Sequence, residues 1–172
     1  RMPGEFEKQD GCLMIYPWRP GSWNYNAKYA RDVFVQIAHI LAAYEDVYMI
    51  VRPEDMKEAI TRLDHPYIHI IEASSDDAWA RDTGPTFVVN DKGERRGINW
   101  EFNAWGGSYD GLYSHWENDQ VIPSLICESL GDDLYEARPF VLEGGSIHVD
   151  GEGTLITTEE CLLSPGRNPT MT

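Results

Sequence analysis

The fold is decided by the stretch Thr86-Phe87-Val88-Val89-Asn90-Asp91-Lys92-Gly93-Glu94-Arg95-Arg96-Gly97-Ile98-Asn99-Trp100-Glu101-Phe102. Two β-rich runs, residues 86–89 and 96–102, flank the polar turn Asn90-Asp91-Lys92-Gly93, which predicts a β-hairpin. Apolar residues at helical spacing then predict a helix that ends at Gly131, and residues 134–137 predict a further strand. The resulting order is strand-strand-helix-strand.

The residues before this stretch predict three more strands and two helices. An apolar run at residues 12–16 predicts a strand, and apolar residues every three or four positions from about 27 to 44 predict a helix. Residues 47–51 predict a second strand, a helix beginning near Pro53 follows, and residues 67–71 predict the third strand.

The residues after it predict another hairpin. Residues 147–149 and 154–157 flank Asp150-Gly151-Glu152-Gly153, and a helix is expected to begin at residues 159–163. Element order alone therefore predicts an α/β repeat with about two strand-strand-helix-strand units and part of a third. No Gly-x-Gly-x-x-Gly motif follows the first strand, which argues against a doubly wound, dinucleotide-binding sheet.

Composition limits the classes of partner. The chain has 172 residues, with 14 Lys and Arg against 29 Asp and Glu, for a net charge of −15. Its 42% hydrophobic residues are typical of a folded protein, and its length suits one domain. Because an acidic surface repels nucleic acid and anionic membranes, we expect neither as a partner. The charge suits a cationic small molecule, although many merely solubilised surfaces are also acidic.

The three cysteines, Cys12, Cys127 and Cys161, are far apart and form no Cys-x-x-Cys pair. This pattern favours a reducing compartment over a disulfide scaffold or a zinc knuckle. With no secretory signal visible and no apolar run of eighteen residues, we predict a cytoplasmic protein. We interpret all three cysteines as structural.

An acidic loop is expected between two strands, at Ser74-Ser75-Asp76-Asp77-Ala78-Trp79-Ala80-Arg81-Asp82-Thr83-Gly84-Pro85. One interpretation is a solvated acidic turn in which Arg81 neutralises its neighbours. The other is a site for an organic cation, because carboxylates beside the aromatic face of Trp79 bind such ligands by cation–π attraction and charge-assisted hydrogen bonds.

Two further segments are candidates for chemistry. In Glu143-Gly144-Gly145-Ser146-Ile147-His148-Val149-Asp150, the glycines permit a tight turn or a close ligand approach. His148 and Asp150 would share one face of a strand, where we expect a structural hydrogen-bonded pair, since two ligands do not make a metal site. The aromatic residues of Trp100-Glu101-Phe102-Asn103-Ala104-Trp105-Gly106-Gly107 are more typical of a core or an interface than of a ligand site.

Together these segments closely resemble the agmatine deiminase family, which also includes bacterial peptidylarginine deiminases. The resemblance is carried by residues 2–7, 79–86, 102–107 and 142–169, and it covers nearly the whole chain. It implies a five-bladed α/β propeller (pentein) of strand-strand-helix-strand blades, with the site at the central channel. Residues 1–172 would then be the N-terminal part of a single propeller domain, about two and a half blades, with the C-terminal part absent.

The resemblance also implies an activity: hydrolysis of agmatine to N-carbamoylputrescine and ammonia, in putrescine and polyamine biosynthesis, without metal or organic cofactor. A cysteine thiolate attacks the guanidinium carbon, ammonia leaves, and water hydrolyses the covalent intermediate. Asp82 matches the family aspartate that grips the guanidinium nitrogens. Glu143 matches the carboxylate that binds the guanidinium and assists proton transfer, and Trp79 matches an aromatic wall beside the substrate.

The chain departs from the family pattern in two ways that matter. The family's Gly-His-x-Asp motif and its Gly-rich segment with the nucleophilic cysteine do not occur, and the chain is roughly half the usual length. We therefore expect this chain alone to be inactive. Arg19-Pro20-Gly21-Ser22-Trp23 stands where relatives usually carry Arg-Pro-Asp-Asn-Trp, and Tyr16 stands where tryptophan is common, so the substrate stays open.

Three interpretations follow. The chain is part of an agmatine deiminase, part of a peptidylarginine deiminase, or a truncated non-catalytic relative that binds a partner or a guanidino ligand. Because a broken propeller exposes strand edges, a complementary C-terminal half or a second copy of the chain would be its protein partner.

Overall fold

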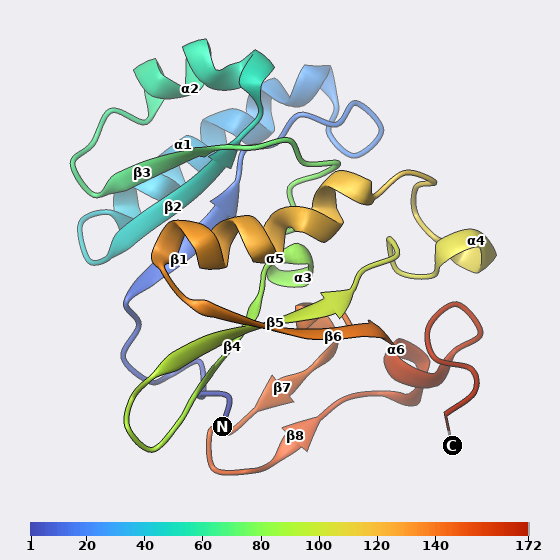
Figure 1. The fold of residues 1–172 in the computed structure, drawn as a ribbon. Helices are drawn as coiled ribbons and strands as arrows, with labels where there is room; N and C mark the ends of the chain where they lie inside the picture. The colour runs from blue at the N-terminus through green and yellow to red at the C-terminus, as the bar shows by residue number, and fades with distance from the viewer. Residues whose placement is uncertain (172) are drawn as a thin grey trace. The chain divides into compact units, whose positions relative to one another are not determined.

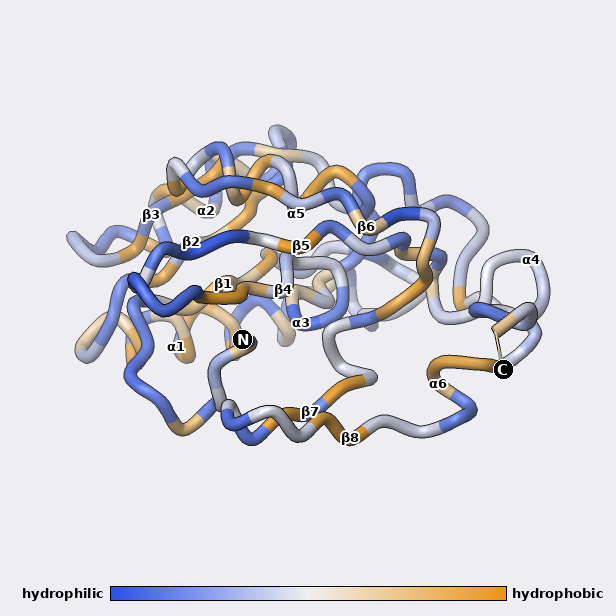
Figure 2. Tube along the Cα trace, turned by 60° about the horizontal axis from the view of Figure 1, so that its bottom comes forward, coloured by the Kyte–Doolittle hydropathy of each residue, from blue (hydrophilic) through white to orange (hydrophobic). Residues whose placement is uncertain are grey.

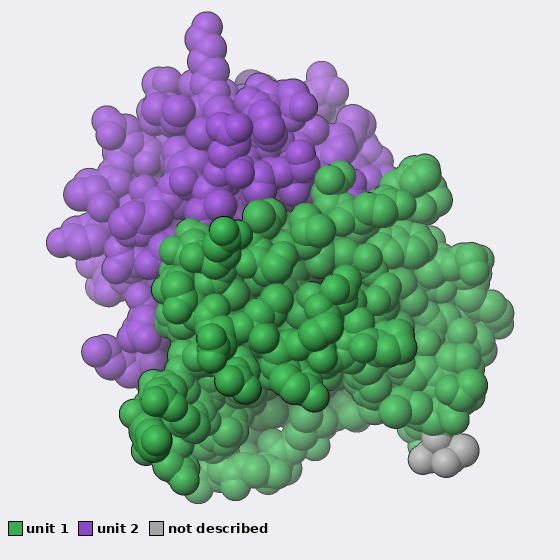
Figure 3. Space-filling model, in the orientation of Figure 1, with its two compact units in different colours: residues 1–7, 81–172 green, residues 8–80 purple. Residues whose placement is uncertain are grey.

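The computed structural model describes residues 1–171, and the chain divides into two compact units (Figure 3). Unit 1 comprises Arg1–Glu7 and Arg81–Thr172, and unit 2 comprises Lys8–Ala80. Each unit contains a three-stranded sheet of its own. A two-stranded hairpin follows the sheet of unit 1, so residues 1–171 hold two three-stranded sheets and one two-stranded sheet.

Unit 2 is an all-parallel sheet with strand order β1-β2-β3 (Figure 1). Its elements are β1 (Gly11–Ile15), the 3-10 turn η1 (Tyr25–Ala27), α1 (Lys28–Leu41), β2 (Asp46–Val51), the 3-10 turn η2 (Pro53–Asp55), α2 (Met56–Arg62) and β3 (Ile68–Glu72). Each pair of neighbouring strands is joined through a helix, as parallel strands require. The predicted order of strands and helices is confirmed.

The core of unit 2 lies between the sheet and both helices. Val47, Met49 and Val51 alternate along β2 and are fully buried in one cluster, together with Ala38 of α1 and Ala59 of α2. Both helices therefore cover the same face of the sheet. The apolar character of the strands is visible at β1 in Figure 2.

Unit 1 has strand order β4-β5-β6, in which β4 pairs antiparallel and β6 pairs parallel with the central β5. These elements are β4 (Thr86–Val89), β5 (Arg95–Glu101), α5 (Glu117–Leu130) and β6 (Asp133–Val141), and α5 packs against β5 and β6 (Figure 1). Unit 1 thus has the predicted strand-strand-helix-strand order. Unit 2 differs from it because a helix, not a hairpin, joins each pair of its strands.

Short elements complete unit 1. They are α3 (Ala80–Thr83), which begins at the last residue of unit 2, α4 (Gly107–Asp110), the 3-10 turn η3 (Gly144–Ser146), the hairpin strands β7 (His148–Val149) and β8 (Leu155–Ile156), and α6 (Glu159–Leu163). The two hairpin strands are apolar, as Figure 2 shows, and Leu155 and Ile156 are exposed.

Local chemistry explains where the elements of unit 1 turn. In the β4–β5 hairpin, Asn90 Oδ1 accepts the backbone N–H groups of Lys92 and Glu94 at 2.9 and 3.0 Å, and Gly93 supplies the left-handed backbone. Helix α5 ends where Gly131 adopts φ +71°, a conformation that costs glycine little. The predicted hairpin and helix end are both confirmed.

None of the helices within residues 1–171 combines the length and the apolarity that crossing a membrane requires.

We expect Ile122→Ala to lower the free energy of unfolding by about 2–5 kcal/mol, because the Ile122 side chain on α5 is 0% exposed and its truncation leaves a cavity. The neighbouring Val121, which is 47% exposed, provides the control, and Val121→Ala should change stability by less than about 1 kcal/mol. Urea unfolding of the three chains measures both values. Equal losses would show that α5 does not pack through this face.

Candidate functional site

Two of the predicted site residues, Asp82 and Glu143, meet in unit 1. Asp82 lies in the single-turn helix α3, and Glu143 lies between β6 and η3. The backbone N–H of Gly145 donates to Asp82 Oδ1 at 2.8 Å, which ties the two segments together. Burial is the main cause of the raised pKa of Glu143, and Arg167 opposes it. The negative charge of Asp82 raises this pKa further, so the two carboxyl groups are close enough to interact electrostatically.

The double glycine after Glu143 makes this approach sterically possible. A Cβ on Gly144 would clash with the carbonyl oxygen of Arg81, and a Cβ on Gly145 would clash with Asp82 Oδ1. The turn is closed by Ser146, whose N–H and hydroxyl both donate to the Glu143 carbonyl, at 2.9 and 2.6 Å. The glycines therefore serve a close backbone approach, one of the two roles expected from the sequence.

Glu143 is a buried carboxyl group with a cationic partner. Its side chain is 2% exposed, and Arg167 Nε donates to Glu143 Oε1 at 2.9 Å. Burial raises the pKa of Glu143 above its ordinary value, while the charge and hydrogen bond of Arg167 oppose that rise. The guanidinium of Arg167 is itself only 10% exposed, so this is an ion pair shielded from water.

Asp82 is half-buried, and burial raises its pKa as well. Three groups favour the charged form and limit the rise: the N–H of Gly145, a hydrogen bond from the Trp105 side chain, and the positive charge of Arg81. A guanidinium is a planar cation that only donates hydrogen bonds, so two adjacent carboxyl groups are natural ligands for it.

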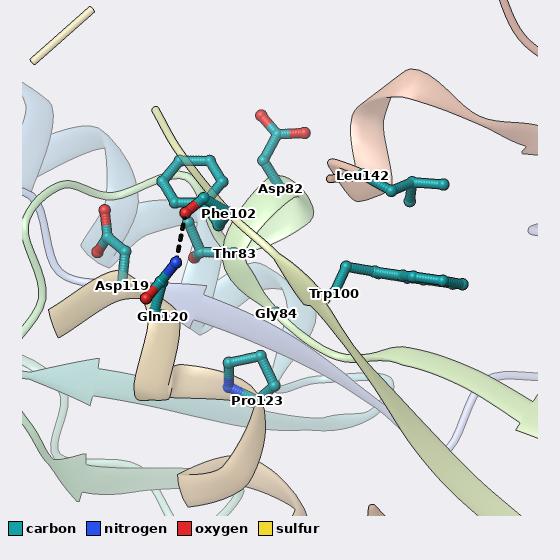
Figure 4. A pocket seen from close by; sticks show the side chains of 9 residues that line it. All are labelled: Asp82, Thr83, Gly84, Trp100, Phe102, Asp119, Gln120, Pro123 and Leu142. Atoms are coloured by element: carbon teal, nitrogen blue, oxygen red, sulfur yellow. Dashed lines mark hydrogen bonds between the residues drawn. The ribbon is translucent and has the colours of Figure 1, made fainter. Parts of the chain in front are cut away.

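A small pocket borders Asp82 (Figure 4). Trp100, Phe102 and Leu142 supply apolar lining, and Gln120 donates from Nε2 to the Phe102 carbonyl at 2.8 Å, the dashed line in the figure. Figure 4 also shows that the carboxyl group of Asp82 points away from Pro123 on the opposite side. The pocket is thus lined by both apolar and polar side chains, and the polar ones are those of Asp82, Thr83, Asp119 and Gln120.

Trp79, the third predicted site residue, belongs to unit 2. The residue is 36% exposed, and its ring stacks on Trp23, with ring centroids 5.6 Å apart and an angle of 27° between the planes. Trp23 is fixed in turn by Asp77, whose Oδ1 accepts the indole N–H at 2.9 Å. Trp79 therefore presents part of an aromatic face on a rigid support.

The interpretation of residues 74–85 as a solvated acidic turn is wrong for Asp76 and Asp77, and Arg81 acts on Asp82 through its charge without forming an ion pair with either of the other two. Asp76 is buried, and Asp77 is 0% exposed and accepts hydrogen bonds from Ser22 and Trp23. Arg81 instead forms an ion pair with Glu5. Burial of these aspartates is possible because neighbouring side chains and backbone groups donate to them.

The expected pair of His148 and Asp150 is also not formed. Asp150 Oδ1 accepts the backbone N–H groups of Glu152 and Thr154 in the turn of the β7–β8 hairpin, while His148 is exposed. A side-chain hydrogen bond from Thr154 and these backbone bonds lower the pKa of Asp150 to about 2. Within residues 1–171, no three or more His, Cys, Asp or Glu side chains are grouped to hold a metal ion.

All three cysteines carry free thiols. Burial raises the pKa of both Cys12 and Cys127, with a further contribution from Glu45 to the former and from Asp132 to the latter. A thiol with a raised pKa is a poor nucleophile, which supports the structural interpretation of these two.

Two residues that contact the site, Trp105 and Arg167, are missed by the sequence reasoning. The aromatic segment does supply core, since Phe102, Ala104 and Tyr113 form a buried cluster against which Trp105 packs. A local sequence signal for a role of Trp105 in the site is the pair Gly106-Gly107 that follows it. This pair indicates a tight turn but not which side chains the turn positions.

Comparison with known proteins finds relatives along the whole length of the chain. The family model of the Porphyromonas-type peptidyl-arginine deiminase matches residues 1–172. The Streptococcus mutans protein named "Putative agmatine deiminase" is 51% identical over 175 residues, which span all of this chain and 47% of that protein. The structure of agmatine deiminase from Enterococcus faecalis is 46% identical, with a TM-score of 0.96, and the match covers 100% of this chain and 47% of that one.

A more distant structure, named "Putative Arginine Deiminase from Porphyromonas gingivalis", is 28% identical, with a TM-score of 0.82 over 99% of this chain and 50% of that one. Such enzymes have the pentein α/β propeller fold, so the predicted fold class is confirmed. The chain spans about half the length of the relatives that it matches.

We expect Glu143→Gln to gain stability relative to the original chain as the pH rises. Because burial raises the pKa of Glu143 in the folded state, the folded chain keeps the carboxyl proton of Glu143 to a higher pH than the unfolded chain does. The folded state therefore loses stability as the pH rises from the unfolded pKa to the folded pKa. The substituted amide does not titrate and escapes that loss, which is about 1.4 kcal/mol for each pH unit between the two pKa values.

Glu136→Gln is the matched control with the opposite sign. A hydrogen bond from Arg138 lowers the pKa of the exposed Glu136, so its contribution is present above the unfolded pKa, and the variant should lose stability relative to the original as the pH rises. Urea unfolding between about pH 4 and 8 measures both trends. Trends of the same sign in the two variants would contradict the conclusion that burial raises the pKa of Glu143.

Proposed function

Because this chain belongs to the family of Porphyromonas-type peptidyl-arginine deiminases, we propose that it supplies the guanidinium-binding part of an agmatine deiminase. The observation that carries the proposal is the meeting of Asp82 and Glu143, two carboxyl groups in one place, one of which already holds a guanidinium from Arg167. The choice of agmatine is supported by relatives of 46% and 51% identity that are named for it.

The proposed reaction is hydrolysis of agmatine to N-carbamoylputrescine and ammonia, a step of putrescine and polyamine biosynthesis. A cysteine thiolate adds to the guanidinium carbon, ammonia departs with its bonding electrons and a proton, and water then releases the thiolate from the covalent intermediate. We propose that the thiolate and the catalytic histidine are supplied by a C-terminal half, because the chain spans about half of its relatives.

In this proposal Asp82 and Glu143 bind the guanidinium nitrogens, and Glu143 also moves protons to the departing nitrogen. The raised pKa of Glu143 suits that second task, since a carboxyl group transfers protons most effectively when its pKa approaches the working pH. Trp79, supported by Trp23, provides an aromatic face for the substrate.

Membership in this family also leads to proposals on domain organisation, cellular compartment and a second substrate. The two compact units would be blades of one propeller domain that the C-terminal half completes. The three free thiols support a reducing compartment, and we propose the cytoplasm. Peptidyl-arginine is the second candidate substrate, because the matching family model carries that name.

We expect the purified 172-residue chain to show no hydrolysis of agmatine or of an arginine peptide in a colorimetric ureido assay. Adding the C-terminal half of a close relative by co-expression should restore turnover, because propeller blades bury their faces against neighbours. Size-exclusion chromatography checks that the halves associate. Turnover by the chain alone that Cys161→Ala abolishes would overturn the structural interpretation of that cysteine, and halves that never co-elute would overturn the split site.

In the completed enzyme, Asp82→Asn and Glu143→Gln should each lower kcat/KM by about 30- to 1000-fold, since each removes a charge-assisted contact worth about 2–4 kcal/mol in the transition state. Trp79→Ala should mainly raise KM, because a wall binds ground and transition states alike. His148→Asn is the control at an exposed position and should cost far less. A His148→Asn enzyme as inactive as Asp82→Asn would move the chemistry to β7.

A further inference from the structure

Arg167 occupies the centre of a network that joins both site carboxyl groups. Its Nε donates to Glu143 Oε1 at 2.9 Å, and its Nη1 donates to the backbone carbonyl of Trp105. Asp110 Oδ1 lies 4.0 Å from the same Nη1. The side chain of Trp105 in turn donates to Asp82. A continuous chain of contacts thus runs from Glu143 through Arg167 and Trp105 to Asp82.

The backbone on each side of Arg167 is fastened to a different part of unit 1. Before it, Asn103 Nδ2 donates to the Gly166 carbonyl at 2.8 Å. After it, the buried Asn168 pairs with the backbone of Val141, accepting its N–H at 2.9 Å and donating to its carbonyl at 2.8 Å. Since Val141 is two residues before Glu143, Arg167 and Glu143 are held at a fixed separation.

Trp105 sits in a turn that is unusual for a residue with a side chain. Ala104 and Trp105 have φ values of +54° and +67°, the left-handed region that costs such residues free energy. The ring is held edge-on by Phe102 and Tyr113, with centroids 5.2 and 6.0 Å away. In this conformation the Trp105 carbonyl accepts a hydrogen bond from Arg167 while its indole donates one to Asp82, so one residue contacts both parts of the network.

We propose that Arg167 and Trp105 are positioning residues, which hold Glu143 and Asp82 as one rigid pair of guanidinium ligands. The inference rests on the proposed function for its purpose, but the geometry that carries it lies within unit 1 alone. Arg167 orients Glu143 and favours its charged form, and Trp105 does the same for Asp82. Neither is proposed to touch the reacting atoms.

The two residues act on different carboxyl groups, and this makes the proposal testable. The charged groups that face Glu143 are Arg167 and Asp82, and beyond Arg167 lies Asp110. The groups that face Asp82 are the Gly145 N–H, Trp105, Arg81 and the Glu143 carboxyl group. Removing Arg167 should therefore change the titration of Glu143 most, and removing the indole N–H should change that of Asp82 most.

The experiment is a carboxyl ¹³C NMR titration of the 172-residue chain, with the two resonances assigned from Glu143→Gln and Asp82→Asn. In Arg167→Met the titration midpoint of Glu143 should move upward by more than that of Asp82, because an uncompensated buried carboxylate is disfavoured. In Trp105→Phe, which keeps an aromatic ring and the backbone carbonyl but loses the indole N–H, the midpoint of Asp82 should move upward by more than that of Glu143.

Two further variants keep the test decisive. Arg96→Met is the matched control, because Arg96 forms an exposed ion pair with Asp133 in the same unit, and it should leave both midpoints unchanged. Arg167→Lys keeps a charge but not the fork that reaches two acceptors, so it should move Glu143 less than Arg167→Met does. If Arg167→Met fails to fold, Arg167→Lys and Trp105→Phe still decide the outcome.

Midpoints that move together in every variant, or that do not move, would overturn the positioning roles. In the completed enzyme, Arg167→Met should lower kcat/KM at neutral pH by about 10- to 150-fold and move the acid limb of its pH profile upward. The NMR result needs no turnover. Selective midpoint changes without activity in the completed original enzyme would therefore refute the proposed function and leave the positioning network standing.

Discussion

One hydrogen bond, from the backbone N–H of Gly145 to the carboxylate of Asp82, organises unit 1 around its candidate site. It joins the segment after β6 to the single turn of α3, which lies some sixty residues earlier in the chain. The bond forms only because Gly144 and Gly145 lack side chains at the points of closest approach. With this contact in place, Glu143 is buried next to Asp82, and two acidic side chains share one low-dielectric region.

Such an arrangement is unfavourable by itself, and the surrounding structure reduces its cost. Two neighbouring carboxylates repel each other, and burial disfavours the charged form of each. The guanidinium of Arg167 compensates Glu143, while the Gly145 N–H and the Trp105 side chain compensate Asp82. The guanidinium of Arg167 is a planar cation, and its charge-assisted hydrogen bond to Glu143 is the kind of contact that a carboxylate makes with such a group.

The sequence predicts the strands and helices well because their signals are local. The Asn90–Gly93 turn, Gly131 at the end of α5 and the apolar alternation of β2 each reflect chemistry within a few residues. The resemblance, which covers nearly the whole chain, also assigns site roles to Asp82 and Glu143; the structure brings these two residues together, and their roles stay predictions. Arg167 and Trp105 lie within the resembling segments 142–169 and 102–107, but the resemblance assigns them no role. Their roles depend on contacts across more than sixty residues and on a left-handed backbone at Trp105, which no local pattern indicates.

The Glu143–Arg167 ion pair has a consequence for the connectivity of the chain. It joins two residues that are 24 positions apart, and the turn after β7 that lies in the loop between them is exposed at Glu152 and Gly153. Asp150 Oδ1 accepts two backbone N–H groups within this turn, and Arg1 Nη1 donates to the Gly151 carbonyl at 3.2 Å. The two ends of that loop are anchored independently of this turn, by Ser146 on one side and by Asn103 and Asn168 on the other. The anchors at the two ends therefore do not involve the exposed residues Glu152 and Gly153, and exposed loop tips of this kind are where proteins tolerate new chain termini and insertions.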